Sequence, residues 1–350
     1  MLINLNPRSG RMTVVFALAI TAMFPMSVRA EIPMPIPRET VPTSLHDKNA
    51  ASLGVPYLEK GILYFAQVRK PTSGKATTDQ TSWQIVGGNV YRLADVNRGT
   101  GEYLYQTISN EHQRNIAGIT TWLGNKNGQS RPVFTGAGYV KLSPGGTYVA
   151  ITDAAGTLRI VDQTGRERSV FGSANGAIFS PDGTKIAFLN TIPHAIGDAG
   201  GISIVDLASG KTLTTYWPDG GEYIPLAFSR DGNVVFFTAD ATMANDDPGN
   251  SSRVDVYALT VSGNAEPQLV TKGELKLPYR DYVRIQYLAD PNLLALAAED
   301  SIWVLNTRTG AIQTIPDVID GYWAGETNTL IARSSDKDTT TRSWNIITTK

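Results

Sequence analysis

The sequence lacks cysteine altogether, has only three histidines, and carries no excess of either charge. Without cysteine, the chain can form no disulfide, thiolate nucleophile, cysteine-ligated metal site or lipid-modified cysteine. Its 31 basic and 32 acidic residues give a net charge of −1, so no basic surface is expected for nucleic acid or an anionic membrane. The fold must therefore be held together by an apolar core and backbone pairing, which 350 residues can provide.

The motifs of the common catalytic classes are also missing. The three histidines are His46, His112 and His194. None of them has a second ligand at the spacing typical of a zinc site. The closest approach to a hydrolase nucleophile elbow, residues 201–205, lacks the second glycine. A phosphate-binding loop ending at Lys211 would need a glycine where Val205 stands. We therefore predict a protein with no catalytic residues and no cofactor.

The first thirty residues have the composition of a secretory signal. Arg8 and Arg11 form a basic start, residues 12–26 are almost wholly apolar, and small residues flank Arg29 just before the predicted cleavage site after Ala30. The apolar run is shorter than the roughly 20 residues of a membrane span. We predict cleavage after Ala30, a periplasmic mature protein without a membrane span, and a net charge of about −4 once the three arginines of the signal are removed. A retained anchor is the alternative.

Residues 31–54 form a Pro-rich arm or linker. Prolines alternate with apolar residues at Pro33, Pro35 and Pro37, and Pro42 follows. Because proline fixes φ and has no N–H, this arm should be extended and poorly suited to the centre of a sheet. It is either a tether left by export or an arm that docks on a partner or on the rim of its own domain.

From residue 55 onward, one turn motif recurs between apolar strands. Residues 176–190 read GAIFSPDGTKIAFLN, residues 139–151 read YVKLSPGGTYVAI, and residues 224–238 read IPLAFSRDGNVVFFT. Proline presets φ at the second turn position, and Asp and Gly tolerate the conformations that follow. The motif predicts a tight turn between two strands, repeated along the chain.

A second strand pair follows each motif, and four strands per unit predict an all-β fold. Strands such as residues 157–162 and 301–306 end in Asp or Asn before a Gly-containing turn. The fold class is therefore a β-propeller of four-stranded antiparallel blades over residues 55–350. We expect six blades, near residues 55–106, 137–172, 174–217, 222–271, 280–316 and 319–350. A seventh is the alternative if residues 116–133 form another unit, and residues 343–348 or those near Val55 should close the ring.

The FSPDGTKIAF stretch resembles the repeat of TolB-type, WD-repeat-like propellers and of the propellers in prolyl oligopeptidase-like hydrolases. Three motif copies, at Ser143, Ser180 and Ser229, carry the resemblance over some 210 residues. It implies a periplasmic six-bladed propeller. Residues 31–54 leave no room for the α/β domain that precedes the propeller in TolB, so only the repeat is similar.

Long insertions indicate where a partner would bind. They are expected at residues 70–88, 111–132, 190–201, 239–253 and 266–279, all on one face of the propeller, whereas the other face should carry only tight turns. This long-loop face should present the candidate partner-binding residues Trp122, His112, His194, Asp198, Asp246 and Asp247. Trp122 is expected in a loop. Oxygen ligands gather at Asp240, Asp246 and Asp247, where calcium is an alternative to a solvated turn.

Two hypotheses about function follow. The first is an exported, non-catalytic propeller that acts as a protein–protein interaction or scaffold module in the bacterial cell envelope, binding an envelope protein, a peptide or a glycan through the long-loop face. The alternative is a propeller enzyme, lactonase-like or dehydrogenase-like, with a calcium-dependent site built from loops over the central channel. The predicted channel strands contain few acids and no histidine, which favours the first.

Overall fold

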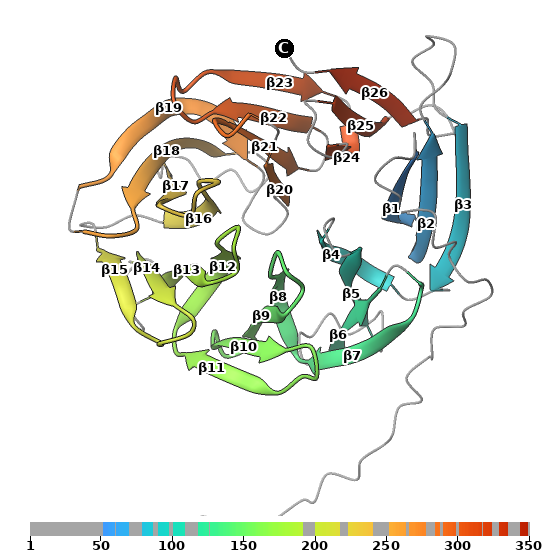
Figure 1. Ribbon diagram of the computed structural model, residues 1–350, viewed down its shortest axis with the longest axis horizontal. Coiled ribbons are helices and arrows are strands. Elements are labelled where there is room, and N and C mark those ends of the chain that lie inside the picture. The colour runs from blue at the N-terminus through green and yellow to red at the C-terminus, as the bar shows by residue number, and fades with distance from the viewer. Residues whose placement is uncertain are drawn as a thin grey trace, which may run out of the picture. The chain divides into compact units, whose positions relative to one another are not determined.

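The computed structural model is an all-β propeller. It describes residues 52–59, 61–69, 79–86, 90–97, 101–108, 118–125, 127–191, 200–217, 223–240, 252–263, 266–277, 284–287, 290–298, 301–316, 318–323, 329–334 and 344–348. Within these ranges the chain forms 26 strands. They make seven sheets, of which five have four strands and two, the first and last along the chain, have three. The sheets follow one another in chain order around a ring (Figure 1).

Each sheet is a meander of consecutive strands, and we number the sheets along the chain. Sheet 1 contains β1 (Ser52–Glu59), β2 (Ile62–Arg69) and β3 (Asp79–Val86). Sheet 2 contains β4 (Val90–Asn97), β5 (Glu102–Ile108), β6 (Ile119–Gly124) and β7 (Ser130–Thr135). Sheet 3 contains β8 (Ala137–Leu142), β9 (Tyr148–Asp153), β10 (Leu158–Asp162) and β11 (Glu167–Phe171). Sheet 4 contains β12 (Ala174–Phe179), β13 (Lys185–Thr191), β14 (Gly200–Asp206) and β15 (Thr212–Tyr216).

The second half of the ring repeats this arrangement. Sheet 5 contains β16 (Tyr223–Phe228), β17 (Val234–Asp240), β18 (Ser252–Thr260) and β19 (Gln268–Leu277). Sheet 6 contains β20 (Arg284–Tyr287), β21 (Leu293–Ala298), β22 (Ser301–Asn306) and β23 (Ile312–Pro316). Sheet 7 contains β24 (Val318–Trp323), β25 (Thr329–Ser334) and β26 (Trp344–Thr348).

The predicted fold class is confirmed, and the strand bounds decide how the N-terminal region is divided. The predicted unit 55–106 falls into two sheets, because β1 to β3 pair only with one another among the described strands, and β4 and β5 pair onward with β6 and β7. Residues 116–133 supply β6 and part of β7, so the seven-unit alternative matches the number of sheets. One unit was predicted in place of these two sheets because neither sheet carries the Ser-Pro-Asp-Gly motif.

The core is divided into layers between neighbouring sheets. One buried cluster joins Leu158 and Ile160 of sheet 3 to Phe179, Ile186 and Val205 of sheet 4, and similar clusters fill the spaces between the other consecutive sheets from sheet 1 to sheet 7. Both faces of sheets 2 to 6 are therefore covered. This explains why inner strands read as unbroken apolar runs rather than as alternating patterns.

The connections between strands define two faces of the ring. Paired strands are antiparallel, so successive connections leave a sheet at opposite ends. First-to-second and third-to-fourth connections, such as residues 180–184, share one end, which we call the turn face. Second-to-third connections, such as residues 192–199, share the other end with the connections between sheets. We call this end the loop face.

Sheet 1 follows this pattern, but its first described strand, β1, occupies the position of a second strand. Residues 87–89 join β3 to β4, and three residues reach only about 10 Å, too short to cross an eight-residue strand. β3 must therefore end at the loop face, where β4 begins, and β1 runs in the direction of a second strand. A hydrogen bond agrees with this assignment. Val90 N–H donates to Gly61 O in the β1–β2 connection, as Ala174 N–H donates to Gly156 O in a second-to-third connection.

Candidate functional site

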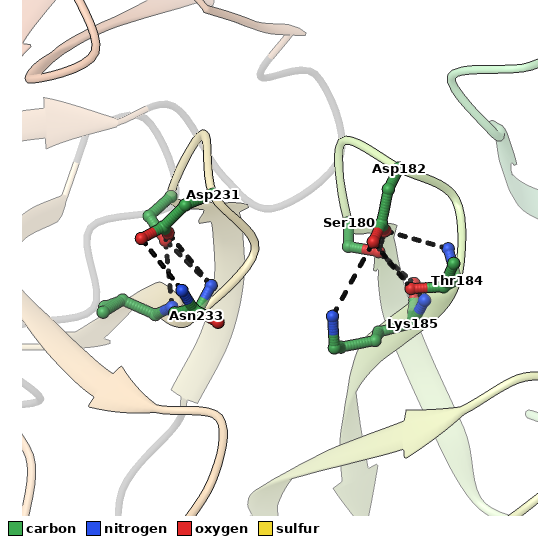
Figure 2. Close-up of polar contacts among 8 residues, drawn as sticks. Ser180, Asp182, Thr184, Lys185, Asp231 and Asn233 are labelled. Atoms are coloured by element: carbon green, nitrogen blue, oxygen red, sulfur yellow. Dashed lines mark hydrogen bonds and ion pairs between the residues drawn. The ribbon is translucent and has the colours of Figure 1, made fainter.

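In two turns of the turn face, side chains form hydrogen bonds within their own turn (Figure 2). In the β12–β13 turn, Ser180 Oγ donates to Asp182 Oδ1 and accepts the Lys185 N–H at 2.9 Å. Asp182 also accepts the Thr184 N–H at 3.0 Å and the Thr184 hydroxyl at 2.8 Å. The motif thus builds a local network because serine and aspartate stand two residues apart, just before the turn glycine.

The β16–β17 turn repeats the network with Asn233 in place of threonine. Ser229 Oγ donates to Asp231 Oδ1 at 2.6 Å, and Asp231 accepts the Asn233 side-chain amide at 3.0 Å. In the β8–β9 turn a glycine, Gly145, stands at the aspartate position, and Ser143 Oγ accepts the Tyr148 N–H at 2.9 Å. The turn predicted from the sequence is therefore confirmed in all three copies.

The turn-face carboxylates are held in their charged form. Burial raises the pKa of Asp182, but the hydrogen bonds from Ser180 and Thr184 outweigh it and bring that pKa to about 2. Hydrogen bonds, first that from the Ser229 hydroxyl, likewise lower the pKa of Asp231. In the third-to-fourth turn of sheet 3, the Thr164 hydroxyl bond is the main cause that lowers the pKa of Asp162 to about 2. These carboxylates serve turn formation.

A polar seam on the inner strands joins sheets 2 and 3. Asp95 on β4 accepts the backbone N–H of Leu142 at 2.8 Å and pairs with the ammonium of Lys141 at 3.3 Å. Asn97 donates to the backbone oxygens of Ser143 and Pro144. Both charged side chains of the pair are largely buried. These contacts hold sheet 2 against sheet 3. The carboxylate of Asp95 is engaged by Leu142 and Lys141 of sheet 3.

The loop face presents an aromatic side chain on a glycine platform. Trp217 follows β15 directly, and its side chain is 43% exposed. Gly201 lies beside it on β14, where Ile202 pairs with Tyr216. A Cβ on Gly201 would lie 2.8 Å from Trp217 Cδ2, so only glycine lets the indole lie this close to the strand. The glycine therefore sets where the indole lies at the surface.

An aromatic cluster supports this platform from the core side. Tyr216 makes an edge contact with Tyr223 and a tilted contact with Phe237, whose ring stacks with Tyr257 at 5.6 Å. Phe237 is buried, and the three tyrosines are partly exposed. Burial is the largest cause that raises the pKa of Tyr216, so this phenol stays neutral at ordinary pH. Aromatic surface of this kind, apolar with polar tips, is enriched at protein interfaces.

Trp122 does not lie in a loop, and that prediction was wrong. It stands in the middle of β6, is 3% exposed, and stacks on Tyr105 with ring centroids 6.1 Å apart. Its indole N–H donates to Thr107 Oγ1 at 2.9 Å. Nearby Gly118, Asn125 and Gly128 suggested a loop, but these residues flank a six-residue strand. A buried indole offers no surface to a partner.

Of the other predicted site residues, the structure describes only Asp240. Asp240 is the last residue of β17, at the loop face, where it pairs with Val254. Five residues lie outside the part of the chain that the structure describes, namely His112, His194, Asp198, Asp246 and Asp247.

Two of the five predicted insertions, 190–201 and 239–253, are connections at the loop face, and of the predicted 111–132 only residues 111–118 are, because the rest contains β6 and the start of β7. Residues 109–118, 192–199 and 241–251 each join a second strand to a third. Residues 70–78 join β2 and β3 at their turn-face ends, contrary to prediction, because sheet 1 begins with a second-position strand. Residues 266–279 are mostly β19, so that insertion was also wrong. With residues 335–343 between β25 and β26, the loop face receives four long second-to-third connections, from sheets 2, 4, 5 and 7.

In the described ranges, no group of three or more His, Asp or Glu residues is placed to hold a metal ion. In the same ranges, no helix has the length and apolar character that a membrane crossing requires.

Comparison with known proteins supports the fold. No protein family model matches the sequence, and no curated protein does. Hydrazine synthase from Kuenenia stuttgartiensis has a similar structure, with a TM-score of 0.53 and 10% identity over 86% of this chain and 93% of that one. The tricorn protease has a TM-score of 0.50 and 11% identity over 81% of this chain, which spans only 31% of that protein. TolB from Acinetobacter baumannii has a TM-score of 0.46 and 16% identity over 85% of this chain and 79% of that one. At these identities the first two similarities show the fold alone.

Proposed function

We propose that this protein is an exported, non-catalytic propeller that binds a protein partner in the bacterial cell envelope through its loop face. The observation that carries the proposal is the contrast between the two faces. On the turn face, Asp182, Asp231 and Asp162 are engaged by their own turns. On the loop face, Trp217 is exposed on Gly201, and long connections of four sheets emerge.

The chemistry of the exposed ring supports a protein partner. A tryptophan that is already half buried loses little side-chain freedom when a partner covers it, and tryptophan is enriched among residues that dominate binding energy. Because Gly201 has no side chain, the indole can lie against the backbone of β14. The rigid sheets beneath supply the scaffold on which loops commonly carry function.

A pair of single substitutions in sheet 4 tests the proposal. Trp217→Ala removes the exposed ring on the loop face, and Lys211→Ala changes an exposed residue in the β14–β15 turn on the opposite face. Each tagged protein is expressed in its own cells, crosslinked with a reagent of fixed length, and purified from the envelope. We expect one stoichiometric partner with the wild type and Lys211→Ala, and a loss of at least tenfold in its recovery with Trp217→Ala. Equal recovery from the two variants would contradict the loop-face assignment.

A calcium titration separates this function from the calcium-dependent alternative. A ligand that binds only the folded protein raises its unfolding temperature. We expect the midpoint of thermal unfolding to be the same in millimolar Ca²⁺ and in chelator. A higher unfolding midpoint in Ca²⁺ than in chelator, absent in the Asp240→Asn variant, would instead favour the calcium-dependent enzyme.

A further inference from the structure

The outer strand of sheet 4 differs from the outer strands of the other four-stranded sheets. β15 lies at the outside of the ring, and within the described ranges it pairs only with β14 (Figure 1). β7, β11 and β19 each contain charged residues, and β7 and β23 each contain a proline, whereas β15 reads TLTTY and contains neither. Charges and prolines on an outer strand protect it against pairing with a further strand. Of these five outer strands, β15 is the one without this protection.

The hydrogen bonds at the end of β14 show which backbone groups of β15 point outward. Asp206 N–H donates to Lys211 O, so Asp206 faces β15. Every second residue of β14 therefore faces β15 as well, and the partners of two of these residues are Thr214 and Tyr216. Thr215 lies between them, so its N–H and C=O point away from β14. These two groups have no partner strand within the described ranges, and the Thr215 side chain is exposed.

This open edge leads to the exposed indole of the loop face. Trp217 directly follows β15 and is 43% exposed. A strand rises about 3.3 Å per residue, so a segment that pairs with Thr215 reaches Trp217 two residues further on. The edge has no charge from Thr212 to Tyr216. An uncharged segment matches it, because a charged residue placed against it would lose water without meeting an opposite charge.

We propose that the partner of the loop face contributes an extended, uncharged segment that pairs with β15 as a fifth strand of sheet 4 and places a side chain against Trp217. This inference rests on the proposed function and adds the form in which the partner binds. Main-chain hydrogen bonds give such a segment its affinity, and the contact with the indole gives specificity. The geometry favours a segment over a second copy of this chain, because pairing of two five-residue edges covers much less than the roughly 1,200 Å² that a stable interface buries.

A proline at position 215 tests the strand pairing. Thr215→Pro removes the outward N–H and leaves the bonds between β15 and β14 in place, whereas Thr215→Ala removes only the side chain. Both tagged full-length proteins are crosslinked in their own cells and purified from the envelope, as for Trp217→Ala. We expect recovery of the partner to fall about tenfold with Thr215→Pro relative to Thr215→Ala. Val170→Pro makes the same change at the equivalent outward position of β11 and should not alter recovery.

A second pair of variants keeps the test independent of proline. Thr215→Lys places a charge on the neutral edge, and Thr215→Met introduces a side chain of similar length without charge. Recovery of the partner should fall with Thr215→Lys and stay unchanged with Thr215→Met. The thermal unfolding midpoint of each variant shows that the protein is folded before its recovery is compared.

Hydrogen exchange in the purified complex reports on the strand itself. The amide of Thr215 points outward in the free protein, so it should exchange about tenfold more slowly once a partner strand accepts its hydrogen bond. The amide of Val170 should exchange at the same rate in the free protein and in the complex.

The outcomes separate this inference from the proposed function. Suppose that Trp217→Ala loses the partner, but Thr215→Pro and Thr215→Ala recover it equally and the Thr215 amide gains no protection. That result would overturn the strand pairing and leave binding through the loop face standing. Equal recovery from Trp217→Ala and Lys211→Ala would overturn both. A crosslinked product made of two copies of this chain, lost in Thr215→Pro, would refute a partner segment in favour of self-association.

Discussion

The indole of Trp217 lies so close to the backbone of Gly201 that a Cβ at that glycine would lie 2.8 Å from Trp217 Cδ2. Real Cβ atoms essentially never approach so closely, and the backbone of Tyr216 blocks the same space. The exposed ring can therefore occupy this position only because the neighbouring strand carries no side chain at residue 201.

We predict that Gly201→Ala destabilises the protein by about 1–3 kcal/mol, the usual cost of overpacking a close contact. Chemical unfolding at neutral pH measures this change. Gly172→Ala is the matched control, because a Cβ there meets nothing within 4 Å, and it should be close to neutral. Equal costs for the two variants would show that the indole does not depend on the glycine.

Trp122 should behave as a core residue. Trp122→Ala removes a ring that is 3% exposed and stacked on Tyr105, and we expect a loss of about 3–5 kcal/mol in the free energy of unfolding. Trp217→Ala, which removes a ring that is 43% exposed, should cost clearly less. Urea unfolding curves of both variants provide the comparison. A small cost for Trp122→Ala would argue for the loop position first expected for it.

The turn acids should make stability depend on pH in a narrow acidic window. Asp182 has a folded-state pKa of about 2 against an ordinary value of 3.8. Its lowered pKa stabilises the fold fully above about pH 4, and this contribution is lost as the pH falls toward 2. Asp182→Asn should therefore be less stable than the wild type at pH 7, with a difference that shrinks between pH 4 and 2. Urea unfolding at a series of pH values tests this, and a difference independent of pH would refute it.

The seam between sheets 2 and 3 should be more sensitive than a surface ion pair. Asp95→Ala removes the acceptor of the Leu142 N–H and the carboxylate that faces Lys141, and we expect a cost of about 2–3 kcal/mol. Glu167→Gln breaks the exposed pair with Arg159 and should cost less than about 1 kcal/mol. Calorimetric unfolding of both variants measures the contrast. Similar costs would mean that the seam contributes little.

Sequence reasoning succeeded where structure is local. The Ser180–Asp182 turn forms from residues two apart, and so its position could be predicted from the motif alone. Third strands such as β14 were predicted from an apolar run followed by a Gly-containing turn.

Errors arose where structure depends on distant partners. Trp122 is buried because sheet 1 packs against sheet 2, and no neighbouring residue signals that contact. Trp217 was missed because its contact with Gly201 depends on the pairing of β14 with β15; the double glycine at residues 200–201 was the available signal. The first two sheets were merged because their turns lack the motif.

The most direct test of the central claim places a photo-crosslinking amino acid at position 217 in one protein and at position 211 in another, each produced in its own cells. The two positions lie at opposite ends of sheet 4, so they sample the loop face and the turn face on one rigid unit. We predict one discrete crosslinked species from position 217 and none from position 211. A product from position 211 alone, or from both positions equally, would contradict binding through the loop face.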